Sequence, residues 1–91
     1  MSNMHHLQNT EEAGRALRER REAQGMTQAQ LAEAAGTTRA RLSLLERGQA
    51  NVSLRSYLRL VQALGAMLVL EPASERPTLA QLRRAAEDGA R

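Results

Sequence analysis

The sequence TQAQLAEAAGTTRARLSLLERG, residues 27–48, contains two short helical patterns separated by a tight turn. The patterns cover residues 28–35 and 39–47. A threonine precedes each of them, and its hydroxyl is suited to accept a hydrogen bond from a free amide of the first helical turn. A glycine follows each of them, and glycine readily adopts the positive φ that ends a helix. The caps are Thr27 and Gly36 for the first helix and Thr38 and Gly48 for the second.

The two predicted helices bury apolar stripes and leave one polar face free. The first stripe consists of Leu31, Ala32 and Ala35, and the second of Leu42, Leu45 and Leu44. Two capped helices joined by a turn of about three or four residues form a helix-turn-helix, whose second helix can enter a DNA major groove. We therefore expect the polar face of the second helix to meet base pairs. That face carries Thr38, Arg39, Ala40, Arg41 and Ser43.

Similar helical patterns lie on both sides of this unit. On the N-terminal side, Thr10 is expected to cap a helix that Gly25 ends. On the C-terminal side, Ser53 is expected to cap a helix over residues 54–64 that Gly65 ends. The predicted buried residues are Ala13, Ala16 and Leu17 in the former and Leu54, Tyr57, Leu58, Val61 and Leu64 in the latter. Four or five short amphipathic helices predict a compact all-α bundle.

A continuous apolar run follows the last of these helices and consists of Ala66, Met67, Leu68, Val69 and Leu70. Its length, its valine and the flanking Gly65 and Glu71-Pro72 favour a β-strand. The chain has no second strand pattern, and a lone strand would leave backbone groups unpaired at about 1–3 kcal/mol each. We therefore predict that the same segment of another copy pairs with it in an antiparallel ribbon across a two-fold axis. The alternative is that these residues extend the preceding helix into the core.

The domain boundaries follow from these patterns. The predicted division is 1–9 for a flexible N-terminus, 10–71 for the helical domain with the strand at 66–70, and 72–91 for a C-terminal tail. In the tail, Thr78 is placed to cap a short amphipathic helix over residues 79–86. Leu79 and Leu82 are its only large apolar residues. Three roles stay open for this helix: to fray, to cover the dimer, or to dock on a partner protein.

Composition and charge narrow the function classes. The 91 residues are enough for one small domain, and the absence of cysteine excludes disulfides, thiol catalysis and cysteine-ligated metal. No apolar run approaches the roughly 20 residues that span a bilayer, and no signal peptide opens the chain, so we expect a cytoplasmic protein without membrane contact. Residues 15–59 hold nine arginines and four glutamates, a net charge of +5, whereas the charges from residue 60 onward cancel. Positive charge on the segment that holds the helix-turn-helix favours a nucleic-acid partner.

Neither catalysis nor metal binding has a candidate group of residues. Ser43, Ser53 and Ser56 have no histidine or lysine spaced to activate them, and no glycine-rich phosphate loop is present. His5 and His6 are adjacent, but no cluster of histidine and acidic residues completes a metal site around them. We therefore expect no enzyme activity, no cofactor and no metal.

The run LRERREAQGMTQAQLAEAAGTTRARLSLLERGQANVSLRSYLRLVQALG, residues 17–65, resembles the Xre, or lambda-repressor-like, helix-turn-helix family over nearly its whole domain. The shared motifs are Gly-hydrophobic-Thr-Gln before the first helix of the unit, Leu-Ala inside it, Ala-Gly at its end, and Leu-Glu-Arg-Gly closing the second helix. The strand-like run that ends at Glu71-Pro72 is similar to that of HipB-like antitoxins, in which a short strand after the last helix pairs across the dimer. Those proteins repress their own operon and bind a HipA-type kinase toxin.

The resemblance implies roles for individual residues. Thr27, Gln28 and Arg47 would hold or approach backbone phosphates, and Gln28 would also buttress the second helix. Arg21 and Glu46 occupy the positions of an arginine–glutamate pair that is structural in the family. Two positions depart from the family pattern. Thr37 stands where an apolar residue is usual, and Ala40 can offer only a methyl contact, for example to thymine.

These observations predict a homodimeric, sequence-specific transcriptional repressor on a palindromic operator in double-stranded DNA. Arg39 or Arg41 is the expected bidentate partner of a guanine. As a HipB-like antitoxin, the protein would autoregulate its operon and bind a HipA-like kinase toxin. Two alternatives stay open: a stand-alone Xre-type regulator with no toxin partner, and an interaction module whose main role is to neutralise a kinase toxin.

Overall fold

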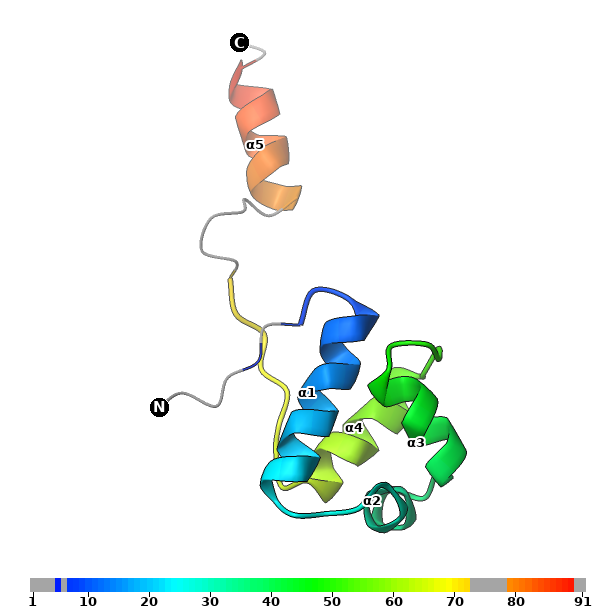
Figure 1. Cartoon of the computed structure of the whole chain (residues 1–91). Coiled ribbons are helices and arrows are strands. Elements are labelled where there is room, and N and C mark those ends of the chain that lie inside the picture. Colours follow the sequence, from blue (N-terminus) through cyan, green and yellow to red (C-terminus); the bar gives the residue numbers. More distant parts are fainter. Residues whose placement is uncertain (1–4, 6, 73–78, 90–91) are drawn as a thin grey trace.

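The computed structural model describes residue 5, residues 7–72 and residues 79–89, and it contains five helices within these ranges (Figure 1). Four of them group into one bundle, and the fifth stands apart from it. The helices are α1 (Thr10–Ala23), α2 (Gln28–Ala35), α3 (Arg39–Glu46), α4 (Leu54–Ala63) and α5 (Leu79–Gly89). The all-α prediction and the order of the helices are therefore confirmed.

Local capping explains where each bundle helix begins and ends. Serine or threonine caps the N-termini of α2, α3 and α4 as predicted, through Thr27, Thr38 and Ser53. The predicted cap of α1 is wrong by one residue: Asn9 holds this position, and its Oδ1 accepts a hydrogen bond from the Glu12 amide at 2.8 Å. Each of the four helices is followed by a glycine with φ between 68° and 73°. These glycines are Gly25, Gly36, Gly48 and Gly65.

The core of the bundle is made of leucine, alanine, one valine and the single tyrosine. α2 packs against both α3 and α4, and α1 packs against α3. The buried cluster consists of Leu17, Leu31, Ala32, Ala35, Leu42, Leu45, Tyr57, Leu60, Val61 and Leu64. Two of the residues of α4 that were expected to face inward lie outside the core cluster: Leu54 is 68% exposed and Leu58 is half-buried. Leu60, which was not among the predicted buried residues, is buried. Leu54 is the first residue of the helix and projects beyond the core, and Leu60 shares the face of Tyr57, Val61 and Leu64 at the helical period. Leu44 is also exposed, because it lies beside the stripe of α3 and not on it.

Close backbone contact and two side-chain hydrogen bonds fix α1 against α3 and α4. A Cβ added at Gly14 would collide with the carbonyl oxygen of Leu45, so only glycine lets α1 approach α3 this closely. The Tyr57 hydroxyl donates to the Ala13 carbonyl at 2.9 Å. Gln24 Nε2 donates to the Leu64 carbonyl at 2.5 Å. The bundle therefore holds α3 at a defined position relative to the rest of the domain.

Residues 66–70, expected to form a strand, have no regular secondary structure in the single chain. A strand exists only through ladder hydrogen bonds to a neighbouring strand, and the described residues of this chain provide no such neighbour. The alternative of a longer α4 is also wrong, because Gly65 turns to a φ of 68° and ends the helix. Ala66 is half-buried against the core, and the four residues after it are exposed.

The tail contains α5, which begins at the expected Leu79 and ends at Gly89, three residues beyond the expected limit. Its predicted cap Thr78, residues 73–77 of the predicted tail and most of the predicted flexible N-terminus lie outside the described residues. Every residue of α5 with a described side chain is exposed.

Candidate nucleic-acid interface

The outer side of α3 presents the residues that sequence reasoning assigned to base contact. Thr38, Arg39, Ala40 and Arg41 are exposed, and Ser43 is half-buried. The inner side carries Leu42 and Leu45 into the core. In the described part of the chain, neither Arg39 nor Arg41 has a hydrogen bond or ion pair through its side chain. Both guanidinium groups therefore have all of their donors available to an external acceptor.

The helix N-termini of α2 and α3 add polar groups to this side of the domain. The Thr27 hydroxyl accepts from the Gln30 amide at 3.1 Å, and the Thr38 hydroxyl accepts from the Arg41 amide at 3.2 Å. Each hydroxyl uses a lone pair in this way and keeps its proton for donation. The remaining first-turn amides have no partner within the helix, and together with the helix dipole they favour an anion such as phosphate.

A buried ion pair ties the end of α3 to α1. Arg21 Nε donates to Glu46 Oε2 at 2.7 Å, and Arg21 Nη2 donates to Glu46 Oε1 at 2.9 Å. Arg21 is 9% exposed and Glu46 is 6% exposed, so this fork is removed from solvent. The hydrogen bond to Glu46 raises the pKa of the Arg21 guanidinium, and burial opposes this effect. The pair neutralises an acid that would otherwise place an unpaired negative charge at the end of α3.

The same pair also fixes the start of α2. Arg21 Nη1 donates to the Met26 carbonyl at 2.8 Å, in the loop between α1 and α2. Gln28 Nε2 donates to Glu46 Oε1 at 3.1 Å. The structure thus brings together Arg21, Glu46 and Gln28, and through them it joins α1, α2 and α3. The N-terminus of α2 and the outer side of α3 are consequently held in a fixed relation.

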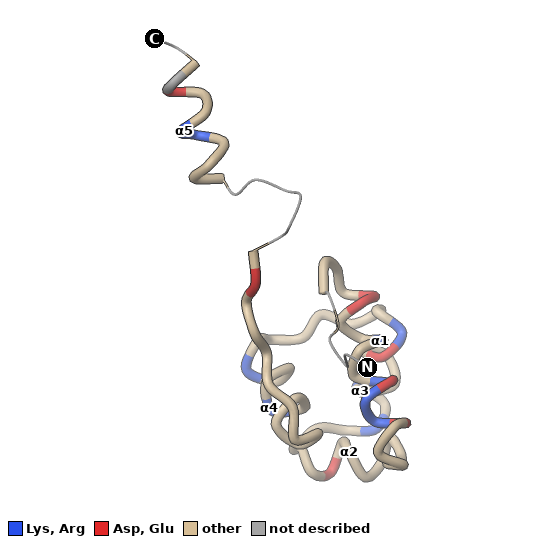
Figure 2. The backbone as a smooth tube through the Cα atoms, turned by 90° about the vertical axis from the view of Figure 1, so that its left-hand side faces the viewer, with Lys and Arg blue, Asp and Glu red and all other residues tan. Residues whose placement is uncertain are grey.

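Arg47 lies at the C-terminal end of α3, where its side chain folds back on the helix. Its Nε donates to the Ser43 carbonyl at 3.3 Å, and the residue is exposed. Its two terminal nitrogens have no hydrogen bond among the described residues. The arginines of the bundle lie on α1, α3 and α4 and on the residue after α3, whereas α2 carries a glutamate and no arginine (Figure 2). Of these arginines, Arg39, Arg41 and Arg47 are the exposed ones on or next to α3, where they are able to bind a polyanion.

Comparison with known families decides how to interpret this geometry. Residues 17–66 match the family model described as Helix-turn-helix, and the match covers more than half of the chain. The chain belongs to the Xre-like helix-turn-helix family. Its domain is therefore a DNA-binding regulatory domain. A search of curated proteins found no match to the chain.

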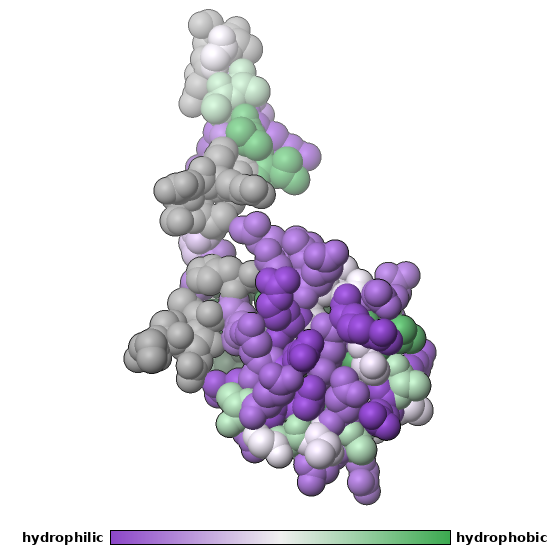
Figure 3. Space-filling view, in the orientation of Figure 1, coloured by the Kyte–Doolittle hydropathy of each residue, from purple (hydrophilic) through white to green (hydrophobic). Residues whose placement is uncertain are grey.

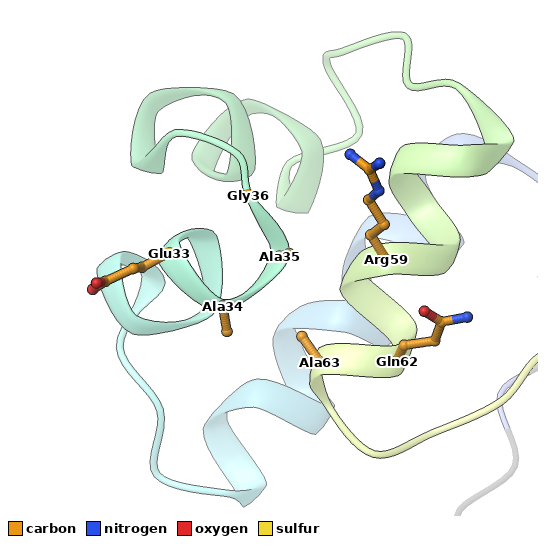
Figure 4. Close-up of a pocket in the computed structure, with 7 residues that line it drawn as sticks. All are labelled: Glu33, Ala34, Ala35, Gly36, Arg59, Gln62 and Ala63. Atoms are coloured by element: carbon orange, nitrogen blue, oxygen red, sulfur yellow. The ribbon is translucent and has the colours of Figure 1, made fainter.

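An open cleft of about 510 Å³ lies between the end of α2 and α4 of this helix-turn-helix domain. Its walls are formed by Glu33, Ala34, Ala35, Gly36, Arg59, Gln62 and Ala63 (Figure 4). Ala34 and Ala63 approach each other across it, whereas Glu33, Arg59 and Gln62 point in different directions (Figure 4). Small-molecule sites place a few polar groups so that they converge on the ligand, and these three do not. The cleft therefore gives no support to a ligand-binding site.

Sequence reasoning missed two features that position α3. Gly14 was not among the predicted packing residues, although a glycine inside a helix is unfavourable by about 1 kcal/mol relative to alanine and so signals close packing. The Met26 carbonyl was missed because backbone acceptors carry no sequence signal.

The described part of the molecule contains neither a membrane-spanning helix nor a cluster of metal ligands. None of its helices is long and apolar enough to cross a membrane. Among the same residues, no group of three or more histidine, aspartate or glutamate side chains is placed to hold a metal ion.

Proposed function

We propose that this protein is a sequence-specific transcriptional repressor that binds a palindromic operator as a homodimer. The observation that supports it most is the contrast between the two sides of α3. The inner side is fixed by the core and by the Arg21–Glu46 fork, whereas the outer side presents two unpaired arginines. A reading helix needs both properties, because base recognition depends on a rigid placement of free donors.

Within this proposal, Arg39 or Arg41 makes a bidentate hydrogen bond to guanine O6 and N7 in each half-site. Such a contact discriminates against a wrong base by about 1–3 kcal/mol. Thr38, Ala40 and Ser43 complete the surface in the groove, where the Ala40 methyl group is suited to a thymine methyl. The half-sites lie about one helical turn of DNA apart, roughly 34–36 Å, or a multiple of it.

Thr27, Gln28 and Arg47 serve as the phosphate contacts of the same complex. The first-turn amides of α2 and the free hydroxyl proton of Thr27 favour this role, and so do the terminal nitrogens of Arg47. Gln28 already donates one amide hydrogen to Glu46, and its second hydrogen is free for a phosphate oxygen. These contacts would raise affinity equally for all sequences.

The homodimer forms, in this proposal, through antiparallel pairing of residues 66–70 from two copies. Pairing would satisfy the backbone groups on the facing edge of each segment and would bring its exposed apolar side chains beside those of the second copy. In the same proposal, the similarity of residues 66–72 to HipB-like antitoxins extends the role to autoregulation of an operon that also encodes a HipA-like kinase toxin. A stand-alone Xre-type regulator has the same domain and differs only in lacking that partner.

The first experiment measures binding to the DNA upstream of the protein's own gene by fluorescence anisotropy, with scrambled DNA as control and at two salt concentrations. We expect a steep salt dependence on both DNAs and a preference of about 10³-fold or more for the upstream DNA. Equal and weak binding to both would contradict a repressor that acts on its own gene.

Three single substitutions, at Arg39, Arg41 and Arg47, then assign the contacts, and a fourth at Arg84 is the control. Arg39→Ala and Arg41→Ala are compared with Arg84→Ala, which removes an exposed arginine of α5. One of the first two should flatten the preference at one base pair of each half-site, and Arg84→Ala should leave it intact. Arg47→Ala should weaken binding to all sequences alike and reduce the salt slope by about 1. Unchanged specificity in both Arg39→Ala and Arg41→Ala would overturn the assignment.

A further inference from the structure

Exposed apolar side chains concentrate in the C-terminal part of the chain. Ten large hydrophobic residues are exposed in the described structure, and six of them lie beyond Ala66. Hydrophobic side chains are visible on α5 beside hydrophilic ones (Figure 3). The six are Met67, Leu68, Val69, Leu70, Leu79 and Leu82. Apolar residues gathered in this way mark an interaction surface.

Exposure alternates along the first part of this surface. Ala66 packs against the core and Leu68 is 42% exposed, whereas Met67 is 80% and Val69 66% exposed. Successive side chains of a strand point to opposite faces of a sheet. If residues 66–70 pair as proposed above, Ala66, Leu68 and Leu70 therefore share one face, and the contact of Ala66 with the core turns that face toward the bundles. Met67 and Val69 lie on the outer face, where the two copies contribute four apolar side chains.

A two-stranded ribbon of five residues does not hold together by itself. Such a ribbon is marginally stable in water unless it gains further strands or packs against a helix. The bundles cover only its inner face, so the outer face needs a helix with an apolar stripe.

α5 has the properties that this outer face requires. Leu79, Leu82 and Ala86 recur at the helical spacing and form one stripe, and the opposite face carries Arg84. The eight residues from 71 to 78 span at most about 28 Å, enough for the helix to fold back over a ribbon of about 17 Å. From residue 60 onward the charges cancel, so two tails meet without net repulsion, unlike two bundles.

We propose that, in the homodimer, the apolar stripe of α5 packs on the outer face of the ribbon formed by residues 66–70 of the two copies. This inference rests on the dimer described under the proposed function. It gives α5 the role of a covering layer that completes the dimer, with the ribbon of the second copy as part of its binding surface.

Analytical ultracentrifugation of the full chain tests this arrangement with two matched double variants. L79Q/L82Q replaces the two leucines of the apolar stripe with glutamine. A80Q/R84Q introduces two glutamines on the opposite face of α5. Glutamine keeps a high helix propensity in both, and circular dichroism checks that the bundle is intact. We expect the dimer dissociation constant of L79Q/L82Q to rise about tenfold or more, and that of A80Q/R84Q to stay within about twofold.

A third variant, M67T/V69T, locates the contact. If α5 lies on the outer face, adding L79Q/L82Q to M67T/V69T weakens the dimer no further, because the two changes remove the same contact. Fully additive effects, or an unchanged dissociation constant for L79Q/L82Q in a dimeric wild type, would overturn this proposal and leave the dimer itself intact. A wild-type chain that stays monomeric at about 100 µM would instead contradict the proposed dimer.

Discussion

The four-helix bundle and the C-terminal part of the molecule use the same residue types with opposite results. Leucine and alanine dominate both, yet the leucines at the centre of the bundle, such as Leu31 and Leu42, are fully buried. In the C-terminal part, Leu70 is 101% exposed and Leu79 is 72% exposed. Apolar residues are therefore buried here only where a second layer of the same chain lies opposite to them.

Polar contacts within the bundle are of two kinds. In the bundle, the Arg21–Glu46 fork, the Tyr57 hydroxyl and the Gln24 amide link elements that are far apart in sequence. The pair that stands out in α1, Arg18 and Glu22, is by contrast an exposed contact within one helix. The long-range bonds make the bundle a single rigid platform for α3.

The largest expected effect comes from breaking the buried fork. Glu46→Ala leaves the Arg21 guanidinium buried without its partner, and we expect the free energy of unfolding to fall by about 3–5 kcal/mol. Glu71→Ala in the exposed C-terminal part is the matched control and should change it by about 0.5 kcal/mol or less. Urea unfolding followed by circular dichroism measures both. Similar small losses in the two variants would mean that the fork contributes little to the platform.

A second pair of variants applies one substitution to both regions. Leu42→Ala empties a fully buried site and should lower the free energy of unfolding by about 2–5 kcal/mol at every protein concentration. Leu70→Ala removes a fully exposed side chain and should have no effect on the dilute monomer. If the proposed ribbon forms, its effect appears as concentration rises, because association stabilises the folded state by mass action. Unfolding across a dilution series distinguishes the two behaviours.

The same contrast explains how far the sequence predicts this structure. Helix positions, caps and most of the core follow from spacing and from single residues such as Thr27 and Gly36, because these signals act within one helix. An apolar run predicted a strand at residues 66–70, but these residues form no strand in the single chain. A strand depends on a neighbouring strand, which the apolar run alone does not supply. Leu54 was misjudged because an apolar pattern gives the stripe of a helix and not which of its ends extends past the core. Leu60 was missed although its spacing from Tyr57 and Leu64 places it on that stripe.

For the candidate site, the sequence indicates residue types but not all of their contacts. The outward position of Arg39 and Arg41 follows from the helical period, and the Arg21–Glu46 contact was expected only from the family resemblance. The bond from Gln28 to Glu46 and that from Arg21 to the Met26 carbonyl depend on how three elements meet. The roles of these residues toward DNA stay predictions.

A third pair of variants compares two helical glycines. Gly14→Ala should destabilise the bundle by about 1–3 kcal/mol although alanine favours helices, because its Cβ would press on the backbone of Leu45 and Glu46. Gly89→Ala has no atom within 4 Å of the added Cβ and should leave the bundle unchanged or slightly raise the helicity of α5. Urea midpoints and the circular dichroism signal at 222 nm report the two effects. A neutral Gly14→Ala would mean that α1 and α3 are able to separate without loss.

The smallest effect concerns the contact between α4 and α1, and it is expected only at high pH. Burial raises the pKa of Tyr57 above its ordinary value of 10.0. The native state therefore holds this proton more tightly than the unfolded state, so the contribution to stability is complete below pH 10 and is lost as the pH rises through the native pKa. Tyr57 is the only tyrosine, so absorbance at 295 nm follows its ionisation directly.

In a native sample the midpoint of this titration should lie above that in urea, where the side chain is solvated. Tyr57→Phe keeps the ring in the core but removes the hydrogen bond to the Ala13 carbonyl, at a cost of about 0.5–1.5 kcal/mol near neutral pH. Its stability should then lack the additional decline above pH 10 that the wild type shows. Equal midpoints in native and unfolded samples would show that the hydroxyl is in water, and that α1 and α4 are held together by apolar contact alone. The contact between α1 and α4 would in that case lack the polar bond that the structure gives it.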